Sequence, residues 1–155
     1  MRHSRLLIVG VAAAVSAASV CTRAQDNPRD LTRLVEALSI RPGMTVAEIG
    51  AGSGALTVLM AGHVGQDGRV YSTEISDERL RDIRDAVSAA SLRNVTVLQA
   101  GAEATNLPAA CCDAVFMRKV YHHFENPAAV NKSLFASLKP GGRLAVIDFP
   151  PRGGR

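Results

Sequence analysis

The chain has 155 residues, of which 47% are apolar and 21% charged, a balance typical of a single globular domain. This composition excludes a disordered chain, a collagen-like chain and two separate domains, and three cysteines are too few for a disulfide-stabilised scaffold. Three units of the net charge of +4 come from Arg2, Arg5 and Arg23. The rest of the chain has 15 basic and 14 acidic side chains, so it lacks the basic surplus of a nucleic-acid-binding protein and predicts no nucleic-acid partner.

The first 24 residues have the layout of a secretory signal peptide. A basic start is followed by the uncharged run Leu6–Val20, and small residues permit cleavage after Ala24. The run of 15 residues is shorter than the roughly 20 that span a bilayer, which disfavours a stable membrane anchor. The sequence therefore predicts an exported protein, periplasmic or secreted, with a signal peptide over 1–24 and a mature domain over 25–155.

Helix and strand patterns alternate after this leader. Asn27 and Pro28 are typical of a helix start, and Leu31, Leu34 and Leu38 lie on one helical face. Short apolar runs predict five strands, over residues 44–49, 70–73, 95–98, 114–117 and 144–147. Helical patterns lie between most of them, starting near residue 55, at residue 76 or 77 and at residue 126. The alternation predicts an α/β fold with a parallel sheet and helices on both faces.

The adjacent residues Cys111 and Cys112 are the two thiols outside the leader. Neighbouring cysteines close a strained ring, so we expect them to stay unbridged and to fill space in the core or a loop. Two sulfurs without a further ligand at a suitable spacing predict no zinc site.

In a parallel α/β sheet, ligands bind at the carboxyl ends of the strands. The turn Glu48–Gly54 follows the first predicted strand, and its glycines let a ligand approach the backbone and the amides of the next helix. Written from Gly50, the turn also fits the dinucleotide fingerprint, with Glu74 about 20 residues further on. The motif alone leaves two cofactor classes open.

Three features disfavour a dinucleotide. A helix precedes the first strand, Glu48 replaces an apolar residue, and its carboxylate would repel a pyrophosphate. The chain resembles the class I S-adenosylmethionine-dependent methyltransferases, whose first motif is similar to Val46-Ala-Glu-Ile-Gly-Ala-Gly-Ser-Gly54. The similarity extends from about Leu31 to Phe149 and includes five later segments: Val70–Glu74, Asn106–Pro108, Asp113–Phe116, Tyr121–Phe124 and Leu138–Gly142. It implies a Rossmann-like sheet and S-adenosyl-L-methionine as cofactor.

The resemblance implies that the glycine turn holds the amino-acid end of this cofactor. Gly50, Ala51, Gly52 and Gly54 would form the turn around it. Glu48 would lie near its ammonium group, directly or through water.

The ends of the later strands would hold the rest of the cofactor. Glu74 would accept hydrogen bonds from both ribose hydroxyls, and Ile75 would pack on the adenine. Ala102 stands where the family often has an acidic residue, so Glu103 is the substitute there. Arg118 would lie beside the methionine part or the substrate.

The segment after the fourth strand would face the methyl acceptor. Tyr121 would lie on the substrate side, and His122 or His123 is a weak candidate for a general base. Two histidines without a third ligand predict no metal site.

The sequence thus predicts a methyltransferase with an unknown, small-molecule acceptor. The alternatives are a remnant that binds the cofactor without turnover and an NAD-dependent oxidoreductase. The family sheet has two further strands, so we expect the domain to be incomplete at its C-terminal end. The strand near 144–149 would then have an open edge, which predicts self-association.

Overall fold

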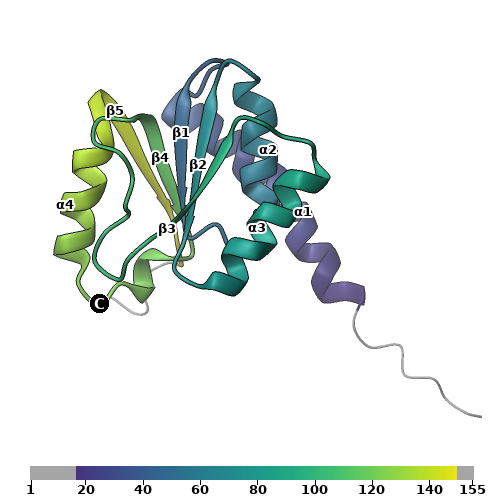
Figure 1. Cartoon of the computed structure of the whole chain (residues 1–155). Coiled ribbons are helices and arrows are strands. Elements are labelled where there is room, and N and C mark those ends of the chain that lie inside the picture. Colours follow the sequence, from purple (N-terminus) through teal and green to yellow (C-terminus); the bar gives the residue numbers. More distant parts are fainter. Residues whose placement is uncertain (1–16, 150–155) are drawn as a thin grey trace, which may run out of the picture.

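The computed structural model describes the backbone of residues 17–149 and the side chains of residues 27–149. Five parallel strands form one sheet in the order β3-β2-β1-β4-β5 (Figure 1). Their bounds are β1 Thr45–Ile49, β2 Arg69–Glu74, β3 Val95–Gln99, β4 Cys112–Arg118 and β5 Leu138–Ile147. The chain leaves β1 towards β2 on one side and returns to β4 on the other, so the strand order reverses at β1. This α/β architecture is the predicted one.

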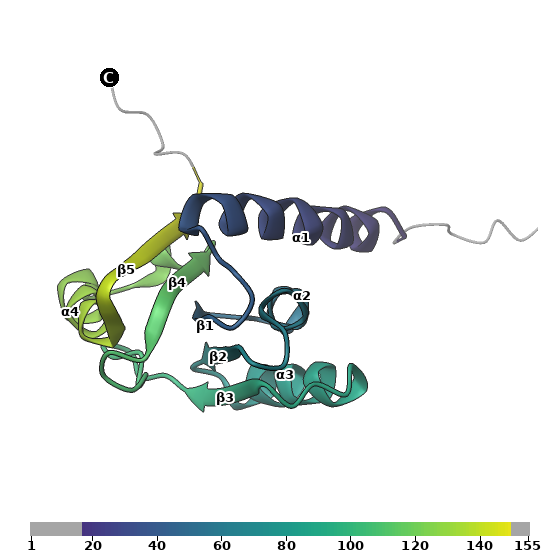
Figure 2. The same cartoon turned by 90° about the horizontal axis from the view of Figure 1, so that it is seen from above.

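Helices cover both faces of the sheet (Figure 2). They are α1 Ala17–Leu38, α2 Ala55–Val64, α3 Asp77–Ala89 and α4 Pro127–Ser137, with a 3-10 turn, η1, at Tyr121–His123. The first three helices lie on one face and α4 lies on the other. The side chain of Asn126 accepts the N–H of Ala129 and caps α4, which confirms the helix start predicted at residue 126.

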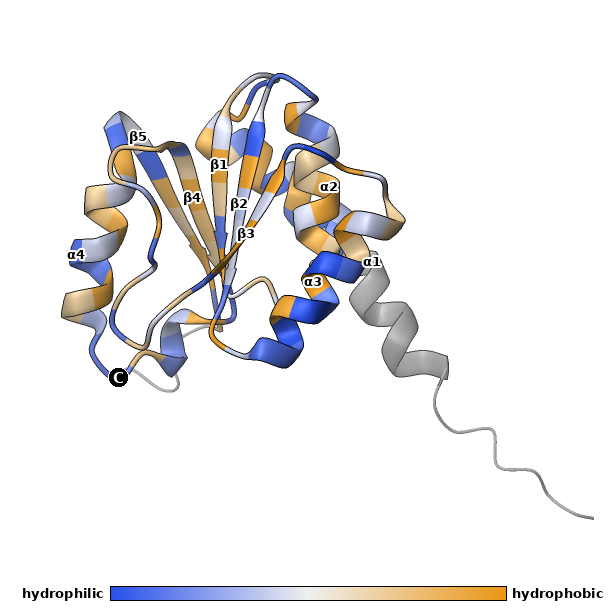
Figure 3. Cartoon of the chain, in the orientation of Figure 1, coloured by the Kyte–Doolittle hydropathy of each residue, from blue (hydrophilic) through white to orange (hydrophobic). Residues whose placement is uncertain are grey.

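Alternate strand residues supply two apolar cores. Val46, Val70 and Phe116 pack with leucines of α1 and α2, whereas Val115 and Met117 point to the opposite face and pack against α4. Figure 3 shows the matching contrast between the apolar central strands and the polar helix α3. This alternation follows from the two-residue period of a strand and brings both layers together around β1 and β4.

Helix α1 begins earlier than predicted. It runs from Ala17, so Pro28 lies inside the helix and Asn27 is not its N-cap residue. The missing N–H of Pro28 removes one backbone hydrogen bond, while the alanine-containing segment before it favours helix. Residues 1–16 of the predicted signal peptide lie outside the described residues.

Cys111 and Cys112 form a disulfide, with the sulfur atoms 2.10 Å apart, so the prediction that they stay unbridged is wrong. The turn before β4 explains the difference. Ala110 adopts a φ of +49° and donates its N–H to the carbonyl of Ala136, while Cys112 is fully buried in the sheet. The turn and the strand thus hold the two sulfur atoms together.

Strand β5 starts six residues before the predicted strand, at Leu138, directly after α4. Within the described chain it pairs with β4 only, which makes it the edge of the sheet. None of the described helices is long and apolar enough to cross a bilayer.

Candidate functional site

The turn after β1 is anchored to the end of β2. The N–H groups of Gly50 and Ala51 donate to the carbonyl of Thr73 at 3.0 and 3.1 Å. Gly50 has a φ of +67°, and a Cβ added there would lie 2.4 Å from Cγ2 of Val120. A Cβ added at Gly52, with φ +60°, would meet no atom within 4 Å. Gly50 is therefore required by packing, whereas Gly52 faces open space.

Glu74, the last residue of β2, holds the other side of this turn. Its Oε1 accepts the N–H of Gly52 at 2.9 Å, and its Oε2 accepts the N–H of Ile75 at 3.0 Å. These bonds fix the carboxylate in one orientation. Each oxygen has a second acceptor site, so the carboxylate can still bind two neighbouring hydroxyl groups.

Glu48 lies on β1 beneath α2 and is 2% exposed. The hydroxyl of Thr57 donates to its Oε2 at 2.5 Å, and Thr57 lies 2.9 Å from the hydroxyl of Ser72 on β2. Burial raises the pKa of Glu48 from 4.5 to about 7, although the Thr57 hydrogen bond and the charge of Arg118 lower it. A cation placed beside Glu48 would therefore stabilise its ionised form.

Arg118, at the end of β4, reaches across to α1. Its Nη1 donates to Oδ1 of Asn27 at 2.6 Å and to Oδ2 of Asp30 at 2.9 Å. Asp30 is 8% exposed, so this ion pair is largely withdrawn from solvent. The pair fastens helix α1 to the end of the sheet beside Glu48.

Two cavities meet at Gly50. The smaller, about 320 Å³, contains one buried acid and three basic side chains, and its lining includes Glu48, Gly52, Arg79, Arg118 and Lys119. The larger, about 400 Å³, is mainly apolar, and its lining includes Glu74, Ile75, Val120, His123 and Phe124. Because Gly50 lines both cavities, the charged lining of one lies next to the mainly apolar lining of the other.

The predicted site residues divide by position. Those that line one of these two cavities are Glu48, Gly50, Ala51, Gly52, Glu74, Ile75, Ala102, Glu103, Arg118 and His123. Glu103 also accepts the side-chain N–H of Asn126 at 2.9 Å. The remaining three, Gly54, Tyr121 and His122, line neither cavity.

Each of these three residues has other contacts. A Cβ at Gly54 would lie 3.1 Å from Cα of Ile83, so this glycine allows close packing of α3. The hydroxyl of Tyr121 accepts the side-chain N–H of Asn131 at 3.1 Å, and its ring packs edge-on against Phe124. His122 pairs with Asp148.

Sequence reasoning missed the partners Thr57, Ser72, Asn27, Asp30 and Asp148. The spacing of Asn27 and Asp30 places them on one face of α1, which was the available signal. The other three need the packing of separate elements to be known. Among the described residues, no group of three or more potential ligands could hold a metal ion.

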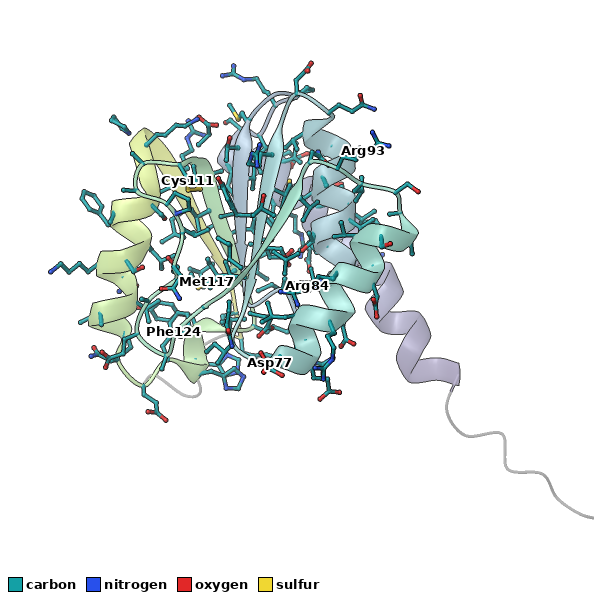
Figure 4. The ribbon with its side chains drawn as sticks, viewed as in Figure 1. Asp77, Arg84, Arg93, Cys111, Met117 and Phe124 are labelled. Atoms are coloured by element: carbon teal, nitrogen blue, oxygen red, sulfur yellow. A yellow bond between two sulfur atoms is a disulfide. The ribbon has the colours of Figure 1, made fainter. Side chains whose placement is uncertain are left out.

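The two cavities lie at the end of the sheet marked by Phe124 and Asp77 in Figure 4, whereas Cys111 and Arg93 lie at the other end.

A family model described as "Methyltransferase domain" matches residues 47–146. The chain belongs to this family. The resemblance noted in the sequence is thereby confirmed, and S-adenosylmethionine is the cofactor of the domain.

Individual relatives agree with this assignment. The ubiquinone/menaquinone biosynthesis C-methyltransferase UbiE of Shewanella pealeana is 33% identical over 116 residues, which are 74% of this chain and 46% of that protein. The enzyme of the same name from Salmonella arizonae is 31% identical over the same coverage. The chain thus spans about half the length of the curated relatives it matches.

Solved structures show the same fold. A SAM-dependent methyltransferase from Aquifex aeolicus superposes with a TM-score of 0.73 at 27% identity, over 81% of this chain and 69% of that one. Coclaurine N-methyltransferase, bound to N-methylheliamine and SAH, gives a TM-score of 0.68 at 23% identity, over 77% and 35%. At this lower identity the second similarity concerns the fold alone.

The residues of the methyltransferase domain fit this cofactor. The smaller cavity contains the Glu48 carboxyl and the Arg118 guanidinium, whose opposite charges suit a ligand that carries an ammonium and a carboxylate. The larger cavity offers the paired acceptor Glu74 for a ribose and apolar side chains for an adenine. Gly52 lines the smaller cavity, and the open space beside it would let a ligand come close to its backbone.

Proposed function

We propose that this domain transfers the methyl group of S-adenosylmethionine to a small-molecule acceptor. The observation that carries the proposal is the meeting of a charged and an apolar cavity at Gly50, with Glu48 in one and Glu74 in the other. When bound, the cofactor supplies an activated methyl carbon on a sulfonium. The protein's task is then to hold the acceptor in line with that carbon.

Different residues of the domain bind different parts of the cofactor and the acceptor. Glu74 binds the two ribose hydroxyls, and its existing bond to Gly52 keeps the carboxylate aligned before the ligand arrives. Glu48 and Arg118 hold the amino-acid end. Val120 and Phe124, which follow β4, form the apolar wall on the acceptor side of the cavity.

The proposal is tested by calorimetric titration of the purified chain. We expect S-adenosylmethionine and S-adenosylhomocysteine to bind and NAD to give no heat of binding. Binding of NAD without binding of the two sulfur nucleosides would instead support an oxidoreductase.

Turnover needs a separate measurement. Release of S-adenosylhomocysteine is followed with acceptor sets of different chemistry: hydroxylated aromatic compounds, amines and thiols. The UbiE relatives are named for C-methylation in quinone biosynthesis, so hydroxylated aromatic rings are the first set. Cofactor binding without methylation of any acceptor would support a binding remnant.

We also propose that residues 1–24 direct export, on the basis of their basic start and uncharged run. Cleavage after Ala24 would leave Asn27 and Asp30, the residues of α1 that bind Arg118, in the mature protein. N-terminal sequencing after expression in a secreting bacterium tests this, with Gln25 expected as the first residue. Recovery of intact Met1 from a cytoplasmic fraction would contradict it.

A further inference from the structure

Glu48 is buried between the sheet and helix α2, yet it lines the smaller cavity. Its Oε2 accepts a hydrogen bond from the hydroxyl of Thr57 at 2.5 Å. Within the described part of the chain, no side chain or N–H group donates to its other oxygen, Oε1. A ligand that occupies the smaller cavity can therefore donate to Oε1.

The hydroxyl groups beside Glu48 can satisfy its carboxyl group in both protonation states. Oγ1 of Thr57 lies 2.9 Å from Oγ of Ser72, and either hydroxyl can be the donor. When Glu48 is ionised, Ser72 donates to Thr57, which donates to Oε2. When Glu48 is protonated, its own O–H donates to Thr57, which then donates to Ser72. Each of the three buried groups thus keeps a partner whether Glu48 holds a proton or not.

Among the described residues, no cation forms an ion pair with Glu48. The charge of Arg118 acts on it from β4, but the guanidinium already pairs with Asp30 at 2.9 Å. Glu74 acts from β2 and adds a like charge. Burial without a paired cation favours the neutral carboxyl group, and the pKa of Glu48 is accordingly raised to about 7.

The other charged or titratable side chains around this cavity have different contacts. Arg79 lines the cavity from α3, but it pairs with Asp82 at 3.1 Å. Lys119 also lines the cavity, and its Nζ lies over an aromatic ring, 5.6 Å from the ring centroid. Helix α2 contributes one titratable residue, His63, which lies in its last turn. An ammonium group of a ligand can therefore be the cation that pairs with Glu48.

We propose that Glu48 is neutral in the ligand-free domain and gives up its proton when the ammonium group of the cofactor binds beside it. This inference rests on the proposed function. The O–H bond of the carboxyl group breaks, the proton passes to water, and the electron pair stays on the carboxylate, which pairs with the ammonium. The same step selects a ligand with a charged amino-acid end, because a ligand without an ammonium leaves Glu48 protonated.

This coupling makes cofactor affinity depend on pH with a definite sign. Below about pH 7 the free site must lose a proton before the ion pair forms, so affinity falls as pH falls. The dissociation constant for S-adenosylhomocysteine is expected to rise about 10-fold between pH 7 and pH 5.5. At about pH 8 and above, Glu48 is already ionised when the ligand arrives, and the dependence levels off.

Proton release is measured by calorimetric titration of the full chain with S-adenosylhomocysteine in buffers of different ionisation enthalpy. We expect about 0.8 proton released per bound ligand at pH 6 and about 0.1 at pH 8. Methylthioadenosine, which has the same nucleoside but no ammonium, should bind without proton release at both pH values. Equal proton release with the two ligands would overturn the inference, whereas failure of S-adenosylhomocysteine to bind would instead overturn the proposed function.

Glu48→Gln removes the titrating group. We expect this variant to bind S-adenosylhomocysteine without the proton release at pH 6 and with a dissociation constant that stays constant between pH 5.5 and pH 7. Glu36→Gln removes an exposed carboxylate of α1 and is the matched control, which should release protons like the wild type. Wild-type proton release by Glu48→Gln would overturn the inference.

Thr57→Val tests the hydroxyl network, and it also decides the question if Glu48→Gln does not fold. The ionised carboxylate loses its donor in this variant, so we expect the midpoint of proton release to move to higher pH. Ser72→Ala should move it less, because Ser72 acts on Glu48 through Thr57. A midpoint in Thr57→Val at or below that of the wild type would overturn the assignment of the released proton to Glu48.

Discussion

Arg118 and Asp30 join the end of strand β4 to helix α1 across 2.9 Å, although 88 positions separate them in the chain. Asn27 accepts from the same guanidinium nitrogen. Through these two contacts the first helix closes one side of the cavity that contains Glu48. The placement of α1 and the shape of the cofactor site are therefore linked.

Asp30→Ala tests this link. We expect a loss of about 1–3 kcal/mol in the free energy of unfolding, because the change leaves a partly buried guanidinium without its carboxylate. Cofactor affinity is expected to fall as well, since α1 is released from the cavity. Urea unfolding and calorimetry measure the two effects. The control is Arg33→Ala, because Arg33 lies 3.9 Å from Asp30 and is 75% exposed, so it should change stability by less than about 0.5 kcal/mol.

Glu48 makes the stability of the ligand-free domain depend on pH. Its pKa is about 7 in the folded state and 4.5 as an ordinary value, so between these pH values the folded chain holds a proton that the unfolded chain has lost. Stability from this group is therefore greatest at low pH and falls as pH rises through the window, by about 3 kcal/mol in all. Glu48→Gln is expected to flatten this slope in urea titrations, and the exposed Glu36→Gln is not. Equal slopes in wild type and Glu48→Gln would contradict the prediction.

Substitutions of Gly50 and of Gly52 are expected to have different effects, the first on stability and the second on cofactor binding. Gly50→Ala places a Cβ 2.4 Å from Val120 and should destabilise the fold strongly. Gly52→Val has free space in the ligand-free chain and should cost about 1–2 kcal/mol from its positive φ alone. It should nevertheless abolish binding of S-adenosylmethionine. Thermal melting and calorimetry separate the two outcomes, and tight binding by Gly52→Val would contradict this assignment.

Glu74→Ala removes the paired acceptor for the ribose. Hydrogen bonds to a charged group are worth about 1.5–3 kcal/mol, so we expect the dissociation constant for S-adenosylhomocysteine to rise about 10- to 150-fold. The lost bond to Gly52 adds to this effect by loosening the turn. Glu78→Ala, an exposed acid on the neighbouring helix, serves as control and should bind like the wild type.

Among the described residues, β5 pairs on one side only, and this edge predicts self-association. Leu144 and Val146 are 43% and 44% exposed on one face of this edge strand, and Phe135 and Phe149 are exposed nearby along the chain. We expect sedimentation velocity to show a concentration-dependent rise in mass, which Val146→Lys reduces by placing a charge on the strand. A single monomeric species at every concentration would contradict the prediction.

The central strands could be located closely from the sequence because they are buried on both faces. Residues 44–49 and 114–117 read as apolar runs, and they lie in the buried strands β1, Thr45–Ile49, and β4, Cys112–Arg118. Strand β5 begins earlier than predicted because Lys139-Pro-Gly-Gly142 has the composition of a turn. In the structure this segment continues directly from α4 into the sheet, and the register of β4 with β5 shifts between Cys112 and Ala114.

The sequence predicted those site residues that lie at or just before the end of a strand, such as Glu48 and Glu74. It did not predict the side chains that form hydrogen bonds with the site residues. Thr57 reaches Glu48 only because α2 packs over β1, and Asp148 reaches His122 only because β5 lies next to β4. Such contacts depend on which elements become neighbours in space, and hydrophobic patterns along the chain do not contain that information.

The position of β1 between β2 and β4 has a consequence for how the domain forms on the ribosome. The N–H of Thr45 donates to Asp113, which is 68 positions further on and is made after β2 and β3. A growing chain can therefore pair β1 with β2 and bring Gly52 to Glu74 while the other edge of β1 is still bare. In such a chain the contact between Gly52 and Glu74 would form before the segment from Val120 to Phe124 has been synthesised. Cofactor present during translation would meet a partly built site, and a chaperone that shields strand edges would meet the bare side of β1.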